Sequence, residues 1–187
     1  TQTIRLRQFV EFPELVSEDL DFSNGRLEYI KELYREAGKL AVFTFFNESA
    51  KKIKDFFDTE FYISGDVDPE KRIGIINKFN EAESGLYIST DAGRFGVDLI
   101  GVDKVVHYGY LYNPASMTQR EDRLHRFGQK KTVNVYRPFY PGTIDEGIMS
   151  IASGRWGDII EFMEGTETMS RAKLSKVDYR RLVYGEL

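Results

Sequence analysis

The sequence contains no cysteine, which excludes disulfide bonds, thiolate metal sites and cysteine nucleophiles. Its only imidazoles are His107 and His125. Structural zinc sites need four clustered ligands, so two separate histidines argue against one, and we expect no metal-binding residues in this chain. The lack of cysteine is typical of proteins in a reducing, intracellular compartment.

Long apolar runs and an excess of positive charge are also missing. No run is long enough to cross a bilayer, and the N-terminus lacks the layout of a signal peptide, so we expect a soluble intracellular protein without membrane contact. The 26 Lys and Arg are outnumbered by 30 Asp and Glu, which gives a formal net charge of -4. This balance excludes a uniformly basic nucleic-acid coat, so any phosphate contact must be local.

A nucleotide cradle is absent as well. No G-x-x-x-x-G-K-[ST] loop occurs, because Gly38-Lys39 is followed by Leu40 and begins an apolar run. No apolar strand ends in an Asp-Glu pair suited to Mg²⁺, since Asp145-Glu146 falls within an expected capping box. The chain therefore lacks the usual means of gripping a nucleoside triphosphate by itself.

The 187 residues, 41% of them hydrophobic, suffice for one domain with a sizeable core. Short apolar runs alternate with amphipathic segments, some of which begin at cap residues such as Asn47 and Asp68-Pro69. The apolar runs lie at 39–46, 60–64, 85–90, 103–109 and 131–139. This alternation predicts an α/β fold with an open, mainly parallel sheet and helices on both faces.

Three parts follow along the chain. Residues 1–22 contain the alternating run IRLRQFVEF and an acidic stretch, which favour an edge strand or a linker from a preceding domain. Residues 23–142 form the α/β domain. A capping box of Thr143 and Glu146 then begins residues 143–187, a C-terminal helical extension that we expect to pack on the domain.

The stretch QREDRLHRFGQ, residues 119–129, falls in a predicted helix that begins at Asn113-Pro114. On a helical wheel Gln119, Arg123 and Arg126 lie within roughly 60° of one another. Guanidinium groups suit phosphate oxygens because they donate in bidentate geometry and stay charged. The alternative is an ordinary surface helix in which Asp122 and Arg126 form an ion pair. Periodicity alone leaves both interpretations open.

The same stretch resembles motif VI of the superfamily two helicases, in the form found in Swi/Snf-type DNA translocases. KLAVFTFF is similar to motif IV, and ISGDVDPEKRIGIINKFN to the block after it. LYISTDAGRFGVDLIGVDKVVHYG followed by YNPASMTQ resembles motif V and the approach to motif VI. The resemblance covers most of residues 23–148 and implies the second RecA-like motor domain.

The resemblance implies that Arg123 and Arg126 act as catalytic arginine fingers on ATP, and that Gln119 organises their contact. Gly96 and Asp98 lie towards the nucleotide. The implied nucleic-acid-binding residues are Ser89, Thr90, Gly65, Arg72 and Arg94. Two positions depart from the family pattern, since Arg94 stands where a glycine is usual and Asp98 where an asparagine is usual. From the residues alone, the glycines of this loop also suit an ordinary turn between strands.

The expected function is that of a second motor lobe in an ATP-dependent translocase or helicase that acts on nucleic acid, with duplex DNA implied by the resemblance. ATP and Mg²⁺ would be held mainly by a first lobe, supplied by the same chain or another, so we expect the isolated chain to be inactive. The alternative is a free-standing, non-catalytic RecA-like module with a binding or regulatory role.

Overall fold

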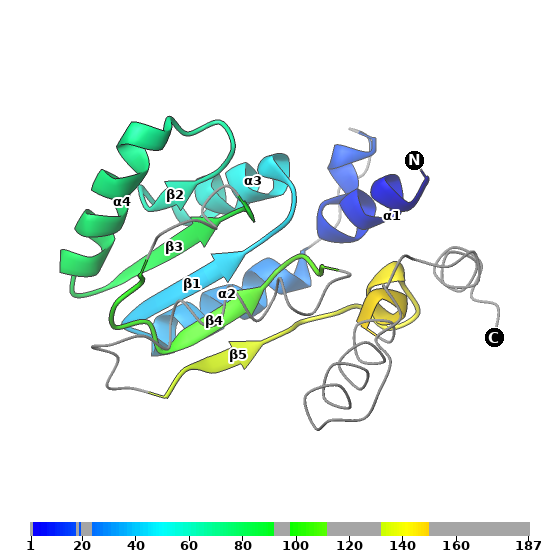
Figure 1. The fold of residues 1–187 in the computed structure, drawn as a ribbon. Helices are drawn as coiled ribbons and strands as arrows, with labels where there is room; N and C mark the ends of the chain where they lie inside the picture. The colour runs from blue at the N-terminus through cyan, green and yellow to red at the C-terminus, as the bar shows by residue number, and fades with distance from the viewer. Residues whose placement is uncertain (1, 18, 20–23, 92–97, 112–131, 150–187) are drawn as a thin grey trace, which may run out of the picture.

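The computed structural model describes residues 2–17, 19, 24–91, 98–111 and 132–149 (Figure 1). The elements are α1 (Gln2–Glu11), η1 (Pro13–Leu15), α2 (Gly25–Glu36), β1 (Lys39–Phe43), α3 (Asn47–Phe57), β2 (Tyr62–Ile63), α4 (Pro69–Glu81), β3 (Gly85–Ser89), β4 (Lys104–His107) and β5 (Asn134–Tyr136). Residues 144–149 are helical as well. Within these residues no helix is both long enough and apolar enough to span a membrane.

The strands form a five-stranded sheet in the order β2-β3-β1-β4-β5. Every neighbouring pair is parallel. Each residue of the central strands β1 and β3 is buried. Strands covered on both faces need apolar side chains in both directions, which explains their continuous apolar runs. The expected α/β fold with a parallel sheet is confirmed.

Alternate residues of β1 supply the cores on the two faces of the sheet. Leu40 and Val42 belong to a buried cluster that includes residues of α2 and α3. Ala41 and Phe43 belong to a second cluster with residues of α4. Burying one such large side chain stabilises the fold by about 1.5–3 kcal/mol. The predicted helical cover of both faces is therefore present (Figure 1).

The N-terminal segment differs from the expectation. Residues 2–11 form helix α1 rather than an edge strand. Leu6 and Val10, four residues apart, pack against a third cluster that includes Tyr110 and Ile148. Arg7 and Glu11 lie on the buried side of the helix, so the apolar residues alone do not show the helical period. The alternating pattern of IRLRQFVEF was a misleading strand signal.

The predicted cap of α4 is confirmed, because the Asp68 carboxylate accepts a hydrogen bond from the Glu70 backbone N–H at 3.0 Å and Pro69 follows it. The predicted cap of α3 was wrong. Its N-cap is Phe46, and Asn47 is the first helical residue. The Asn47 side-chain oxygen instead accepts from the backbone N–H of Gly65 at 3.4 Å.

The start of the C-terminal helical segment shows capping contacts of a different pattern from the predicted box. The Thr143 hydroxyl oxygen accepts from the Asp145 N–H at 3.3 Å. The Glu146 carboxylate accepts from the N–H of Gly142 at 2.8 Å. Gly142 has a φ of +72°, which suits a glycine at this turn. The predicted helices at 113–128 and beyond residue 149 lie outside the described residues.

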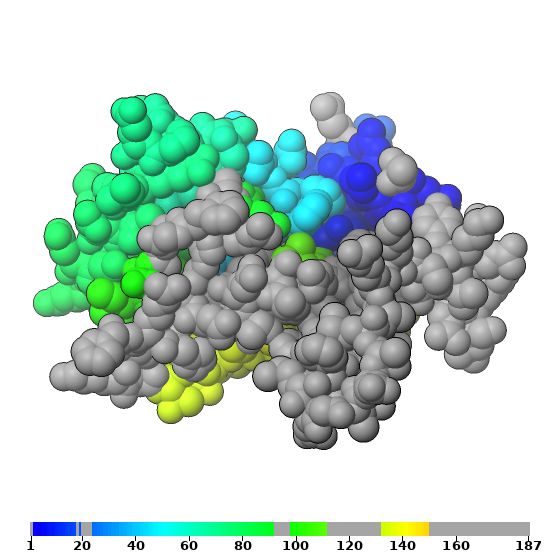
Figure 2. Space-filling view, in the orientation of Figure 1, coloured from blue at the N-terminus to red at the C-terminus, as the bar shows by residue number. Residues whose placement is uncertain are grey.

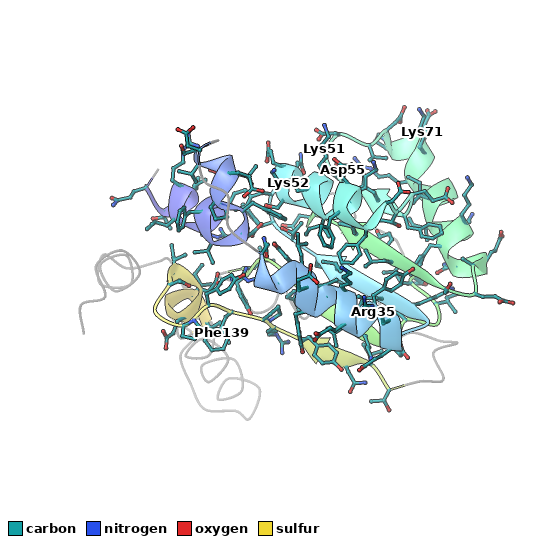
Figure 3. All side chains as sticks on the ribbon, turned by 180° about the vertical axis from the view of Figure 1, so that it is seen from behind. Arg35, Lys51, Lys52, Asp55, Lys71 and Phe139 are labelled. Carbon is teal, nitrogen blue, oxygen red and sulfur yellow. The ribbon has the colours of Figure 1, made fainter. Side chains whose placement is uncertain are left out.

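The outer side of α3 carries charge, as its amphipathic sequence predicts. Figure 3 shows Lys51, Lys52 and Asp55 projecting away from the strands. Lys52 lies 3.1 Å from a carboxylate oxygen of Glu14, and Lys54 lies 3.3 Å from one of Asp55. Such exposed ion pairs contribute little to stability, so this face is chiefly a solvated surface.

Candidate functional site

Four strands end together at one edge of the sheet. The register pairs Phe43 with both Ser89 and His107, and it pairs Ile63 with Ser89. The loops that follow β1, β2, β3 and β4 therefore leave from the same edge. In Figure 1 the arrows of β1, β4 and β5 point towards α1 and the helical segment 144–149. Open α/β sheets bind ligands outside the carboxyl ends of their strands.

We divide this carboxyl edge into two halves. The β2–β3 half comprises residues 64–68 and 89–91, and the β1–β4 half comprises residues 44–46 and 108–111. Figure 2 shows the two halves apart on the visible face: α4, which follows the β2–β3 half, lies at one end, and α1, which covers the β1–β4 half, lies at the other.

In the β2–β3 half, Arg72 organises the loop that contains Gly65. Its Nε donates to the carbonyl of Val67 at 2.9 Å, and Nη2 donates to the carbonyl of Ser64 at 3.3 Å. A Cβ on Gly65 would lie 3.0 Å from the side-chain nitrogen of Asn47, so glycine permits the close approach of that amide. Gly65 and Arg72, both of which the resemblance assigns to nucleic acid, are thus close together: Gly65 lies in the loop, and Arg72 of α4 bonds to two backbone carbonyls of that loop.

Ser89 and Thr90 lie beside this loop, and both are buried. The Ser89 hydroxyl donates to the carbonyl of Thr90 at 2.8 Å. The Thr90 N–H donates to the carbonyl of Ile63 at 3.1 Å, which continues the β2–β3 ladder by one bond. The sheet thus brings Gly65, Ser89 and Thr90 to neighbouring strand ends. Their predicted nucleic-acid contacts remain a prediction.

Asp98 is exposed, and its backbone is held by α4. The Asn80 amide donates to the carbonyl of Asp98 at 2.9 Å and accepts from the N–H of Ile100 at 2.8 Å. Lys39 adds bonds to the carbonyls of Asn80 at 2.9 Å and Ile100 at 3.3 Å, and burial lowers the pKa of its ammonium group. These bonds fix the backbone of residues 98–100.

Five predicted site residues lie outside the described residues. They are Gln119, Arg123, Arg126, Gly96 and Arg94. Within the described ranges, no group of three or more His, Asp or Glu side chains is arranged to hold a metal ion.

The β1–β4 half contains a buried charged cluster that the sequence analysis missed. We call Arg7, Glu11, Arg26 and Asp145 the rim cluster; none of them is more than 6% exposed. Arg26 forms an ion pair with Asp145 and lies 4.6 Å from the ring centre of Tyr140. Burial lowers the pKa of Arg26, although the neighbouring Glu11 carboxylate opposes the shift.

Glu11 is the buried carboxylate of α1. The Thr44 hydroxyl donates to its Oε2 at 2.9 Å. Burial raises the pKa of Glu11, while the Thr44 bond and the charges of Arg7 and Arg26 oppose the increase. A Cβ on Gly109 would collide with Oε1 of Glu11 and would lie 3.1 Å from the backbone nitrogen of Phe45. Glycine after β4 is therefore required for the carboxylate to reach the sheet.

Tyr108 links the rim cluster to the start of α2. Its hydroxyl donates to the carbonyl of Glu11 at 3.0 Å and accepts from the Asn24 amide at 2.7 Å. The same amide also donates to the Glu11 carbonyl at 2.8 Å. Burial raises the pKa of Tyr108 well above its ordinary value, so the phenol stays protonated and can donate this bond.

The sequence held a partial signal for the rim cluster. Arg7 and Glu11 are four residues apart, which places them on one face of a helix, beside the apolar pair Leu6 and Val10. Arg26 and Asp145 carry no such local signal, because their contact joins two distant parts of the chain.

Comparison with known proteins identifies the family to which this fold belongs. Residues 25–128 match the helicase conserved C-terminal domain family. The Sulfolobus solfataricus SWI2/SNF2 ATPase core has a TM-score of 0.69 and 25% identity, over 97% of this chain and 39% of that chain. The same core in complex with double-stranded DNA has a TM-score of 0.66 and 27% identity, over 97% of this chain and 40% of that chain.

Curated relatives agree with these structures. An uncharacterised ATP-dependent helicase of Mycoplasma pneumoniae is 34% identical over 160 residues, which are 81% of this chain and 16% of that protein. The TATA-binding protein-associated factor MOT1 of Saccharomyces cerevisiae is 41% identical over 95 residues, 50% of this chain and 5% of that protein. The chain thus spans a small part of the length of these relatives.

The five-stranded parallel sheet and its flanking helices define the class: a RecA-like helicase lobe. The chain belongs to the helicase conserved C-terminal domain family, in the form found in SNF2/SWI2-family ATPases. The family assignment that motif VI suggested is confirmed.

Proposed function

We propose that this lobe works with a first RecA-like lobe to translocate along duplex DNA at the expense of ATP. ATP and its Mg²⁺ are held mainly by the first lobe, in the same polypeptide or another. Closure of the two lobes around ATP, and reopening after hydrolysis, moves this lobe along the nucleic acid. The SWI2/SNF2 core that was solved with double-stranded DNA supports duplex DNA as the partner.

In this proposal Arg123 and Arg126 approach the γ-phosphate, and Gln119 organises them. Their guanidinium groups neutralise charge that develops during phosphoryl transfer. Gly96 and Asp98 complete the nucleotide side. Contacts from Gly65, Arg72, Ser89, Thr90 and Arg94 follow the phosphate backbone, so binding is largely independent of sequence and sensitive to salt. The protein acts inside the cell.

The observation that carries the proposal is the common end of the strands. The aligned ends of β1, β2, β3 and β4 place the Gly65 loop, Ser89 and Thr90 on the same edge from which residues 108–111 lead to the motif VI segment. One edge can therefore face both a nucleic-acid strand and a nucleotide bound to a neighbouring lobe.

The test is the Arg126→Ala substitution in the two-lobed protein. We expect DNA-stimulated ATP hydrolysis to fall about a thousandfold, because arginine fingers contribute on that order to phosphoryl transfer. The KM for ATP should change little if the first lobe supplies most of the binding. Arg35→Ala, on the exposed side of α2 (Figure 3), is the matched loss of one arginine and should leave turnover unchanged.

Retained turnover in Arg126→Ala would remove that residue from its proposed role and favour the non-catalytic module. The isolated lobe provides a second measurement. It should show no ATP hydrolysis above background and only weak, salt-sensitive binding to duplex DNA, because the phosphate-gripping loop is not in its sequence.

A further inference from the structure

We propose that Arg7 and Arg26 are positioning residues for the ATPase reaction. They fix the backbone from which the chain continues towards Arg123 and Arg126, and the inference rests on the function proposed above. Arg26 lies within residues 25–128, the part of the chain that matches the family, whereas Arg7 precedes it. The resemblance assigned no role to either arginine.

The two guanidinium groups bind the backbone carbonyls of residues 108 and 110, in the buried segment that follows β4. After β4 ends at His107, Arg26 Nη1 donates to the carbonyl of Tyr108 at 2.9 Å. Arg7 Nη2 donates to the carbonyl of Tyr110 at 2.5 Å. A charged donor forms a stronger hydrogen bond than a neutral one, so each contact restrains the backbone more firmly than a neutral bond would.

Each arginine is itself held by its surroundings. The Arg7 guanidinium carbon lies 4.4 Å from the ring centre of Phe45 and 5.4 Å from that of Phe46. Arg26 is paired with Asp145. A guanidinium fixed by rings or by a carboxylate has little rotamer freedom left. It therefore restrains the position of the carbonyl to which it donates.

The energetic cost of this arrangement points to a role in geometry. Burying charged groups costs several kcal/mol each, and apolar side chains of similar volume often stabilise a core equally well or better. Here two buried arginines are balanced by two buried carboxylates, Glu11 and Asp145, from separate parts of the chain. What the charges supply and apolar groups cannot is directed bonding to the carbonyls of Tyr108 and Tyr110.

The consequence for the reaction follows from the sensitivity of catalysis to position. A misplacement of about 1 Å, even by a change far from the chemistry, costs on the order of a hundredfold in rate. Arginine fingers act chiefly in the transition state, so their displacement lowers kcat more than it raises the KM for ATP. A smaller amount of folded enzyme would also lower the apparent kcat at unchanged KM, so rates are normalised to the folded enzyme. A purely structural role for Arg7 would then leave the normalised kcat unchanged.

The experiment compares Arg7→Gln with Arg5→Gln in the two-lobed protein. Both arginines are on α1, but Arg5 is exposed and makes only a 3.5 Å contact to the carbonyl of Leu15. We expect Arg7→Gln to lower DNA-stimulated kcat about tenfold or more, with the KM for ATP within about twofold of the parent. Arg5→Gln should match the parent in both. Equal kcat in the two variants overturns the inference.

A double-mutant cycle with Arg126→Ala tests whether the effect passes through the motif VI segment. Once the finger is removed, Arg7→Gln should reduce the residual rate by less than twofold, because there is nothing left to position. Additive losses overturn the inference and leave the proposed function intact. If Arg126→Ala alone leaves DNA-stimulated turnover unchanged, both the inference and the proposed function are overturned.

Phe45→Leu covers the case in which Arg7→Gln does not fold. Phe45 is partly exposed, so leucine preserves apolar contact there while it removes the ring against which the Arg7 guanidinium lies. We expect a kcat reduction of about threefold, again with KM unchanged and with no further loss in the Arg126→Ala background. An unchanged kcat in Phe45→Leu counts against the inference in the same way.

Discussion

The two halves of the carboxyl edge are built from different chemistry. The β2–β3 half uses small hydroxyls, a glycine and backbone-directed bonds, and its loop residues Gly65, Asp66 and Asp68 are exposed. The β1–β4 half is covered by α1 and contains the buried rim cluster. The first half leaves backbone near the surface for a ligand, whereas the second anchors separate parts of the chain to the sheet.

The difference shows how one edge combines exposed loops with a buried support. Exposed loops are where proteins most often place binding residues, which fits the recognition role proposed for the first half. The chain that follows β4 is held by charge-assisted bonds in a buried setting, where such bonds are strongest. Substitutions in each half test this contrast.

Removal of Arg26 should be the most damaging change. Arg26→Met leaves the Asp145 carboxylate buried without its ion-pair partner. Breaking a buried pair in this way typically costs about 3–5 kcal/mol. Urea denaturation of the chain measures the loss in the free energy of unfolding.

Glu36→Gln is the matched control, because it breaks the 2.8 Å pair of Glu36 with Lys104 at an exposed position. Solvent-exposed pairs contribute little to stability, so the free energy of unfolding should change only slightly. A similar small loss in Arg26→Met would mean that the β1–β4 half is not the rigid anchor described here.

The substitution Gly109→Ala should have the next largest effect. Its Cβ would collide with the Glu11 carboxylate and crowd the backbone nitrogen of Phe45, which cannot move freely. Overpacking of this kind costs about 1–3 kcal/mol. Thermal or urea unfolding measures the change.

Two variants refine this result. Gly74→Ala is on α4 with no neighbouring atom within 4 Å of the added Cβ, so it should stabilise the fold by roughly 0.5–1 kcal/mol. Glu11→Ala combined with Gly109→Ala should cost less than the sum of the single changes, because the shorter side chain makes room. Strict additivity would show that Glu11 does not define the space above Gly109.

How far the sequence predicted this molecule depended on the range of the interactions involved. The apolar runs identified β1, β3 and β4, and Asp68-Pro69 identified the start of α4, because those signals are local. Helix α1 was mistaken for an edge strand, because Arg7 and Glu11 look like solvated charges in a sequence. Their burial depends on Thr44, Gly109 and Tyr110, which are distant along the chain.

The candidate site shows the same limit. The resemblance named Gly65 and Arg72 together, and in the structure Arg72 of α4 bonds to the loop that contains Gly65. It did not reveal that Arg72 bonds to carbonyls of that loop, or that Asn80 holds the backbone of Asp98. Such side chain to backbone bonds depend on loop geometry, which residue spacing alone does not specify.

The pH dependence of stability provides a third, smaller test. Burial raises the folded pKa of Glu11 above its unfolded value of 4.5. Glu11 therefore binds a proton more tightly in the folded state than in the unfolded state. Its contribution to the free energy of unfolding is fully present below pH 4.5 and is lost as pH rises through the folded pKa. The free energy of unfolding of the parent should fall relative to Glu11→Gln above that pH, by at most about 1.4 kcal/mol per pH unit.

Glu36 supplies a control of opposite sign. Its bond to Lys104 lowers the folded pKa of this carboxyl, so its contribution is present above pH 4.5 and is lost as pH falls through the folded value. The difference between the parent and Glu36→Gln should thus grow with pH, while the difference for Glu11→Gln changes the other way. Parallel pH profiles for the two variants would contradict the burial of Glu11.

The smallest effect is expected for Arg72→Gln, and it separates two roles for this residue in the β2–β3 half. If Arg72 acts mainly by ordering the loop through the carbonyls of Ser64 and Val67, its loss weakens duplex DNA binding by a few-fold. The dependence of that binding on salt then stays unchanged. If Arg72 contacts a phosphate directly, the slope of log K against log salt becomes shallower by about 1. We expect the unchanged slope, measured by salt titration of the two-lobed protein, with exposed Lys71→Gln as the control for the loss of one positive charge. A shallower slope for Arg72→Gln alone would show that Arg72 binds a phosphate directly. The β2–β3 half would then use charged side chains on the ligand, whereas the β1–β4 half uses them on its own backbone.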